Sequence, residues 1–371
     1  MTAREAKKRK VSTPRGAKMT RGELLFCLLS VLALLLTFCF ADAAISSMSA
    51  GMRLCIGVVV PSLFPFMVFS DILVSSGGAR LVAMPFSRLA KRLFGISKDG
   101  TVALVLGILC GFPMGTRSAL SLYREGKISR KESEHLLCFC NGPSAAFIIN
   151  AVGLSLFGSR DFGVLLYTSQ TLSSLMVGVI TRSYFEKRQD TLISCAEQSD
   201  ARKGILPSIV RAVKSASEGV VSICAFVIFF SAFTGVLSEL LSRFDAGEFA
   251  SAALIGFFEM TGGASAASTL VAPLSCLFVA AVVGWSGLSV HFQMIGLCES
   301  DKMSLVPYFL AKLLTAALNV ALVAIGMRLL GERIVFSQPS APPVFFEPTI
   351  LPMHLLSVAV LALGVRRRKV S

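Results

Sequence analysis

The sequence predicts an all-α polytopic membrane protein built as an inverted repeat, in which each half contains a re-entrant helical hairpin, a broken helix and spanning helices. Three observations lead to this prediction. Hydrophobic residues make up 54% of the chain and charged residues only 16%, whereas soluble chains usually carry about 25% charge. The basic residues fall in clusters between apolar stretches. Four apolar stretches are interrupted near their centres by glycine, proline or polar residues.

The charge and the cysteines of the chain argue against other classes of protein. The net charge is +14, but the basic residues lie in short runs between apolar stretches without a nucleic-acid recognition motif, so we expect no nucleic-acid partner. Ten cysteines are scattered singly, and the spacing of Cys138 and Cys140 suits neither a redox pair nor a zinc site. We therefore expect membrane lipid as the surroundings, and neither a metal nor another cofactor.

The N-terminal part of the chain consists of a basic cytoplasmic tail, residues 1–23, and a first transmembrane helix, residues 24–48. Ala41-Asp42-Ala43 follows the apolar run and resembles a signal-peptide cleavage site. The apolar run is long enough to span a membrane, which favours an uncleaved helix. A cleaved signal stays open as the alternative.

Residues 49–181 form the first repeat. Two prolines predict a kink in its first helix, and a basic amphipathic helix at 81–96 suits the membrane surface. In the hairpin, residues 101–126, two glycines and a proline stand where a straight helix would have its centre, which indicates a turn. An Asn-Gly-Pro sequence then interrupts residues 129–158 and predicts a broken helix.

A charged cytoplasmic linker, residues 182–204, leads to the second repeat, residues 205–330. The second repeat has the same order of elements as the first. Its hairpin, residues 249–272, is interrupted by Glu-Met-Thr-Gly-Gly. Its broken helix, residues 273–298, is interrupted by Gly-Trp-Ser-Gly-Leu-Ser. We expect the four interruptions to converge on one site.

The chain continues with a loop, residues 331–349, and a last transmembrane helix with a basic tail, residues 350–371. Every strongly basic cluster is cytoplasmic if the first hairpin re-enters from the inside and the second from the outside. This topology places both termini in the cytoplasm and relates the repeats by inversion, as in many secondary transporters. We expect a multi-pass protein of the cell membrane.

The candidate solute-binding residues lie at or beside the four interruptions. Interrupted backbone in lipid leaves N–H and C=O groups without partners, so it persists where it faces a cavity or a ligand. Half-helix N-termini there favour anionic groups. The candidate residues are Gly115, Thr116, Arg117, Asn141, Ser144, Glu259, Thr261, Gly262, Ser286 and Ser289.

Two charged candidates occupy related places in the two repeats, namely Arg117 and Glu259. A charge inside a membrane costs about 2.5–3.5 kcal/mol even on a lenient scale. We hypothesise that they lie near one another, as an ion pair or as contacts to the solute and a coupling ion; Arg117 could instead reach the interface. Asn141 could equally cap the half-helix that follows it. Glu259 and His291 are the candidate ion-coupling residues, with Na⁺ or H⁺ as the ion, and a purely structural role is the alternative for His291.

Motifs of hydrolases, P-loop proteins and dinucleotide-binding enzymes are missing from the sequence. Ser289 and His291 share one segment, but they match a serine-hydrolase arrangement only weakly. We therefore expect no catalytic residues and no enzymatic activity.

Five stretches spread over both repeats carry a family resemblance. They are Gly-Phe-Pro-Met-Gly (111–115), Glu-His-Leu-Leu-Cys-Phe-Cys-Asn (134–141), Ala-Val-Gly (151–153), Phe-Phe-Glu-Met-Thr-Gly-Gly (257–263) and Gly-Leu-Ser-Val-His-Phe-Gln (287–293). In these stretches the chain resembles the Gate-domain, or nucleoside recognition, membrane proteins, and most closely the YlbJ-type sporulation integral membrane proteins. It departs from the family pattern at two positions. The family often has a second asparagine where this chain has Gly142, and often has an asparagine before the glycine where this chain has Gly262.

The resemblance implies an architecture similar to concentrative nucleoside transporters, and a role in endospore formation, where such proteins are associated with moving dipicolinic acid into the developing spore. We therefore expect a transporter or facilitator of a small polar, anionic solute, with dipicolinic acid as the first candidate and the forespore membrane as the location. The alternatives are a nucleoside or nucleobase transporter and a non-transporting scaffold of the sporulating cell. A homo-oligomer is compatible with this resemblance.

Overall fold

The computed structural model describes residues 20–76, 78–186, 205–244 and 247–330, together with Ile334 and Phe336. All regular secondary structure in these ranges is helical. Most of the basic tail, most of the linker and the last transmembrane helix, residues 350–371, lie outside the described residues.

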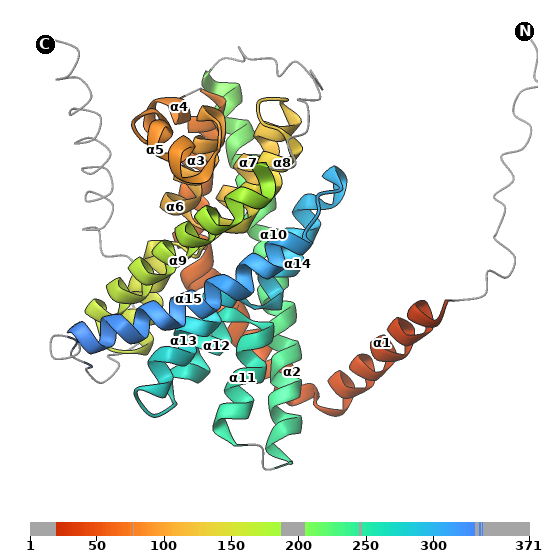
Figure 1. Cartoon of the computed structure of the whole chain (residues 1–371). Helices are drawn as coiled ribbons and strands as arrows, with labels where there is room; N and C mark the ends of the chain where they lie inside the picture. The colour runs from red at the N-terminus through yellow and green to blue at the C-terminus, as the bar shows by residue number, and fades with distance from the viewer. Residues whose placement is uncertain are drawn as a thin grey trace, which may run out of the picture.

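The first helix, α1 (Arg21–Cys39), projects away from the other helices (Figure 1). Thr20 and Glu23 form a capping box at its start, in which each side chain accepts from the backbone N–H of the other residue. None of its residues is buried, and it is long and apolar enough to cross a membrane. It ends earlier than the predicted first span, because the chain turns at Phe40 and continues as α2 (Ala41–Leu54).

The next three elements, α2, η1 (Cys55–Val59) and α3 (Val60–Ser75), follow one another without a break. The element η1 is a π-helical turn immediately before Pro61. Proline has no backbone N–H to donate, so the helical ladder widens here, where the sequence predicted a kink.

A long helix, α10 (Ile205–Ser242), packs along α2 and α3. A Cβ on Gly51 would lie 2.7 Å from the hydroxyl of Ser231, so small residues allow this close approach. The helix is continuous through Gly219.

The region predicted to be the first repeat, residues 49–181, includes the short elements α4 (Gly78–Ala83), η2 (Met84–Phe86) and α5 (Ser87–Phe94). They are followed by α6 (Lys98–Cys110), α7 (Met114–Arg124), α8 (Arg130–Phe139), η3 (Phe147–Leu156) and α9 (Arg160–Glu186). The helices α6 and α7 pack together as the predicted hairpin, called hairpin 1 below. The chain between α8 and η3 is irregular at residues 140–144, called break 1. The helix α9 extends to Glu186, so the first residues of the predicted linker are helical.

The region predicted to be the second repeat, residues 205–330, begins with α10 and continues with α11 (Glu248–Phe258), α12 (Met260–Ser268), α13 (Leu274–Trp285), α14 (Gly287–Cys298) and α15 (Val306–Leu330), with η4 (Glu299–Asp301) after α14. The helices α11 and α12 form hairpin 2, which is interrupted at Glu259 alone. The helices α13 and α14 are separated only by Ser286, whose φ is +76°. Both interruptions are thus narrower than the predicted segments, because the glycines around them remain helical.

The arrangement of the helices places the two hairpins at opposite ends of the molecule (Figure 1). The helices α3 to α8 gather at one end and α11 to α13 at the other, while α9, α10 and α15 run between them (Figure 1). Five helices of the described chain are long and apolar enough to cross a membrane, or six if one bent pair counts as a single span. The fold is therefore that of an all-α, multi-pass membrane protein.

Candidate functional site

Hairpin 1 is seated on break 1 through backbone contacts. The backbone N–H of Phe112, in the turn of the hairpin, donates to the carbonyl of Gly142 at 2.7 Å. A Cβ on Gly107 or Gly115 would lie 2.2 or 2.1 Å from the carbonyl oxygen of Cys140. Glycine is required at both positions because this carbonyl belongs to the backbone and cannot swing away. The predicted residue Gly115 is thus a packing residue beside the break.

The side chains at break 1 form a buried polar group. The hydroxyl of Thr116 lies 2.5 Å from Oδ1 of Asn141 and 2.9 Å from the sulfur of Met294 on α14. The amide of Asn141 donates back to the carbonyl of Leu137 at 2.9 Å. The capping role considered for Asn141 falls instead to Ser144, whose hydroxyl accepts from the backbone N–H of Phe147 at 3.3 Å.

Hairpin 2 is seated on the interruption of α13 and α14, called break 2 (Ser286 and Gly287), in a similar way. A Cβ on Gly287, whose φ is +77°, would lie 2.8 Å from the backbone nitrogen of Met260 and 3.1 Å from Cα of Glu259. The indole N–H of Trp285 donates to the carbonyl of Phe257 at 3.0 Å. Each hairpin is therefore held by the broken helix that follows it in the chain.

Lys312, on α15, joins the two breaks. Its ammonium donates to the carbonyl of Asn141 at 2.5 Å and to the hydroxyl of Ser286 at 3.1 Å. The residue is 2% exposed. Within the described ranges, none of the ion pairs includes Lys312. The contacts thus run from hairpin 1 through break 1, Lys312 and break 2 to hairpin 2, so the four interruptions meet in one centre, as the sequence predicted.

The sequence analysis missed Lys312, although a signal for it was present. It is the only charged residue between Val306 and Met327, in an apolar stretch that spans. An ionisable residue inside such a helix is costly and marks a functional site by default. Tyr308, Thr315 and Asn319 are buried on the same helix, at helical spacing from Lys312. The inward face of α15 is therefore polar.

Arg117 and Glu259 have separate partners in the structure. The guanidinium of Arg117 donates to the carbonyl of Ser215 at 3.2 Å. The carboxylate of Glu259 accepts from the backbone N–H groups of Thr261, at 2.9 Å, and Gly262, at 2.5 Å. Glu259 thus caps α12, where the positive end of the helix dipole stabilises its charge.

The hypothesis of an ion pair between these two residues is therefore wrong: among the described residues no ion pair or hydrogen bond joins Arg117 to Glu259. The N–H groups of Thr261 and Gly262 are also occupied by Glu259, so they are not free for a solute in this conformation. Arg117 lines a cavity of about 210 Å³ with Asp71, Arg124 and Ser215.

The remaining predicted residues lie on α14. His291 is fully buried, and its Nδ1 lies 2.8 Å from the hydroxyl of Tyr308, whereas its Nε2 has no partner. The hydroxyl of Ser289 accepts from the amide of Gln293 at 3.4 Å. Ser289 and His291 thus contact different residues, and the structure shows no hydrogen bond between them.

Several buried polar atoms on the helices around the centre have no hydrogen-bond partner among the residues that the structure describes. They are Oε1 of Gln170 on α9, Nε2 of His291 and Oε1 of Gln293 on α14, and Oδ1 of Asn319 on α15. A buried polar atom without a hydrogen bond costs about 1–3 kcal/mol, so such atoms usually face water or a ligand. A cavity of about 20 Å³ beside break 1, lined by Cys140, Gly142 and Gln170 among others, has room for one water. The centre is therefore polar but tightly packed in this conformation.

The fold and the centre define the class of protein, a multi-pass membrane protein with a polar interior where two broken helices meet. The chain is similar to the sporulation integral membrane protein YlbJ of Bacillus subtilis (strain 168), with 29% identity over 305 residues that cover 74% of this chain and 75% of that protein. This similarity supports a relationship to the family of that sporulation membrane protein. No protein-family model matches the chain, and no solved structure matches it.

Proposed function

We propose that the chain is a carrier for a small, polar, anionic solute that binds between the two breaks at Lys312. The observation that carries this proposal is a buried ammonium without a carboxylate partner in the described chain, held between Asn141 and Ser286. A lone charge at this depth is costly, and an anionic solute would supply the missing opposite charge.

The arrangement of the repeats supports transport across the membrane. Each half has a hairpin seated on a broken helix, and the hairpins lie at opposite ends of the molecule (Figure 1). An inverted repeat of this kind, similar to that of concentrative nucleoside transporters, would let the halves move relative to one another around a fixed site. The hairpins would then re-enter from opposite faces, with both termini in the cytoplasm.

Dipicolinic acid during endospore formation is the solute we propose first. The chain is similar to a protein whose name places it in sporulation. Dipicolinate is a small planar dianion, so one carboxylate could pair with Lys312 while hydroxyl groups such as those of Thr116 and Ser286 donate to its oxygens. The forespore membrane would be the location. The coupling ion is proposed to be H⁺ or Na⁺, with His291, which borders Tyr308 beside the centre, as the residue to examine.

A nucleoside or nucleobase is the alternative solute. It fits the resemblance to nucleoside carriers and the free amide oxygens of Gln170, Gln293 and Asn319. It leaves the charge of Lys312 without a role, which is why we place it second. Uptake of labelled dipicolinate and labelled uridine into proteoliposomes containing the full chain distinguishes the two. Dipicolinate uptake that unlabelled dipicolinate inhibits and uridine does not is the expected result, and uptake of uridine alone would favour the alternative.

A non-transporting scaffold of the sporulating cell is the third proposal. It predicts that the liposomes take up neither solute, and that substitutions at Lys312 leave sporulation intact. Uptake that depends on Lys312 would exclude it. The same liposomes can be examined for a homo-oligomer by chemical cross-linking.

A further inference from the structure

Charged residues of the first repeat hold a loop of the second repeat. This loop, called the clamp loop, comprises residues 299–304 between α14 and α15. Arg124, at the end of α7, donates to the carboxylate of Asp301, with Nη2 2.6 Å from Oδ2 and Nε 3.1 Å from Oδ1. The same guanidinium donates to the hydroxyl of Ser300 at 3.1 Å. Such two-nitrogen contacts to a carboxylate are among the stronger ion pairs.

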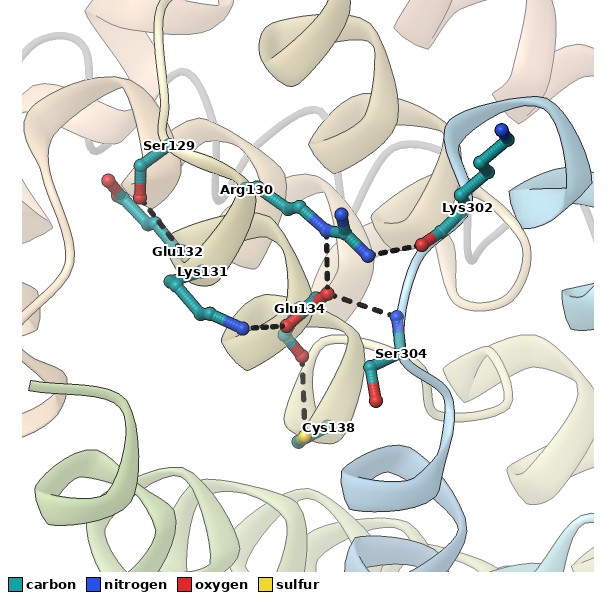
Figure 2. Close-up of polar contacts among 8 residues, drawn as sticks. All are labelled: Ser129, Arg130, Lys131, Glu132, Glu134, Cys138, Lys302 and Ser304. Carbon is teal, nitrogen blue, oxygen red and sulfur yellow. Dashed lines mark hydrogen bonds and ion pairs between the residues drawn. The ribbon is translucent and has the colours of Figure 1, made fainter. Parts of the chain in front are cut away.

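Glu134, in the middle of α8, makes the second attachment (Figure 2). Its carboxylate is buried and accepts from the backbone N–H of Ser304 at 3.0 Å, from Arg130 at 3.0 Å and from Lys131 at 3.1 Å. Arg130 also donates to the carbonyl of Lys302, so both ends of this part of the loop are held (Figure 2). One carboxylate of the first repeat is thereby bonded to the backbone of the second.

The cavity of about 210 Å³ lies next to this clamp and between the two repeats. Arg124 lines it together with Arg117 and Leu120 from α7, Leu297 from α14, and Asp71 and Ser215 from α3 and α10. Arg124 is thus shared by the clamp and the cavity.

A short distance separates the cavity from the centre along the same two helices. Thr116 of α7 and Met294 of α14 lie one residue and three residues before the cavity-lining residues Arg117 and Leu297, and both are fully buried. They contact one another, and Thr116 also contacts Asn141 of the centre. Thr116 and Met294 therefore join the centre to the two helices that line the cavity.

We infer that the solute reaches the centre along the seam between α7 and α14, and that the clamp formed by Arg124 with Asp301 and by Glu134 with Ser304 locks this seam. The inference rests on the proposed function, since it adds a route to the proposed site. Separating α14 from α7 would open the Thr116–Met294 contact, and the clamp loop directly after α14 resists that movement. Two arginines and one carboxylate, that of Asp71, line the cavity, so its net positive charge would attract an anion. In the proposed topology this end of the molecule is on the cytoplasmic side.

The native Cys298 reports on the seam. It ends α14 directly before the clamp loop and is 2% exposed, while Cys276 on α13 is 1% exposed and serves as an internal control. The full chain in liposomes is treated with N-ethylmaleimide, and the modification rate of each cysteine is followed by peptide mass spectrometry. Asp301→Asn and Glu134→Gln should each raise the rate at Cys298 about tenfold, the population shift expected from losing one charge-assisted hydrogen bond.

The matched control is Arg80→Gln, which removes the ion pair of Arg80 with Asp99 within the first half and should leave the rate at Cys298 unchanged. An unchanged rate at Cys298 in both clamp variants, with native melting behaviour, would overturn the inference. A parallel rise at Cys276 would mean general unfolding of a variant, and the decision then passes to a second measurement.

The second measurement locks the seam. The double variant Arg124→Cys with Asp301→Cys is joined by a reducible bifunctional thiol reagent, with the cross-link verified by peptide mass. Dipicolinate uptake should be lost on cross-linking and return on reduction, whereas cross-linked Arg80→Cys with Asp99→Cys should keep its uptake. Full uptake by the locked carrier would refute the route. If no solute is taken up by the unmodified chain, the proposed function fails, while the rate at Cys298 still decides whether the clamp closes the seam.

Discussion

Replacement of Lys312 by methionine separates binding from stability. Methionine keeps an unbranched side chain of similar length but removes the ammonium that contacts Asn141 and Ser286. Burial of a charge in a membrane costs about 2.5–3.5 kcal/mol on a lenient scale, and each hydrogen bond to a charged group returns about 1.5–3 kcal/mol. The two bonds together return about 3–6 kcal/mol, so the contributions partly cancel and the free energy of unfolding should fall by no more than about 3.5 kcal/mol.

The effect on solute binding is measured separately from the effect on stability. Loss of one partner of a buried, hydrogen-bonded charge pair costs about 2–5 kcal/mol, which corresponds to a loss of affinity of about 30-fold to about 4,000-fold. Isothermal titration of dipicolinate into the purified protein measures the affinity, and thermal unfolding without solute measures the stability. The matched control is Lys98→Met, which removes an exposed lysine at the start of α6 and should change neither quantity.

The result that would refute this reasoning is a Lys312→Met variant that binds dipicolinate as tightly as the native chain. The lysine would then have a structural role, pinning the two breaks together, and the anionic solute would lose its main support. A variant that fails to fold is recognised by its melting behaviour, and Lys312→Arg, which keeps the charge, then decides whether charge or shape is required.

Three further predictions concern the packing around the centre. Gly115→Ala should destabilise the protein by about 1–3 kcal/mol, because its Cβ would lie 2.1 Å from a backbone carbonyl oxygen. Gly142→Ala should be nearly neutral, since the nearest atom to its Cβ would be 4.0 Å away. The apparent melting temperatures of the two variants measure the difference. Glu259→Gln should cost about 1 kcal/mol by weakening the cap of α12, and an unchanged denaturation midpoint would contradict the cap. Tyr308→Phe should cost about 1–3 kcal/mol, since it leaves Nδ1 of His291 unpaired, and equal stability of this variant would show that water replaces the hydroxyl.

Much of the fold could be predicted from local sequence signals. The glycine and proline turn at 111–115 and the Asn-Gly-Pro sequence at 141–143 interrupt apolar stretches at places where the structure has breaks. The extent of the second pair of breaks could not be predicted, because a glycine such as Gly262 is compatible with both a helix and a turn, and neighbouring packing decides between them. For the same reason, the sequence alone could not show that α10 continues through Gly219.

The site was predictable in its location and less so in its partners. Lys312 was overlooked because one lysine hardly lowers the average hydropathy of a long apolar helix, although its isolation was itself the signal. The partner of Glu259 was mispredicted because pairing between repeats was favoured over a local cap, and Thr261 and Gly262 stand at the positions that an N-cap side chain reaches. Arg117 donates to the carbonyl of Ser215 on α10, which is 98 positions further along the chain. No local sequence pattern indicates a contact at this separation.

The seating of each hairpin on its own broken helix has a consequence for how the molecule deforms. Backbone atoms contact backbone atoms there: Gly115 lies against the carbonyl of Cys140, and Gly287 lies against Met260. Backbone contacts of this kind cannot relax by a change of rotamer. A hairpin and its broken helix should consequently travel as a single stiff piece. The interface between the two pieces is made by side chains, which can change rotamer. Atomic fluctuations should therefore be largest along this internal surface and small inside each piece.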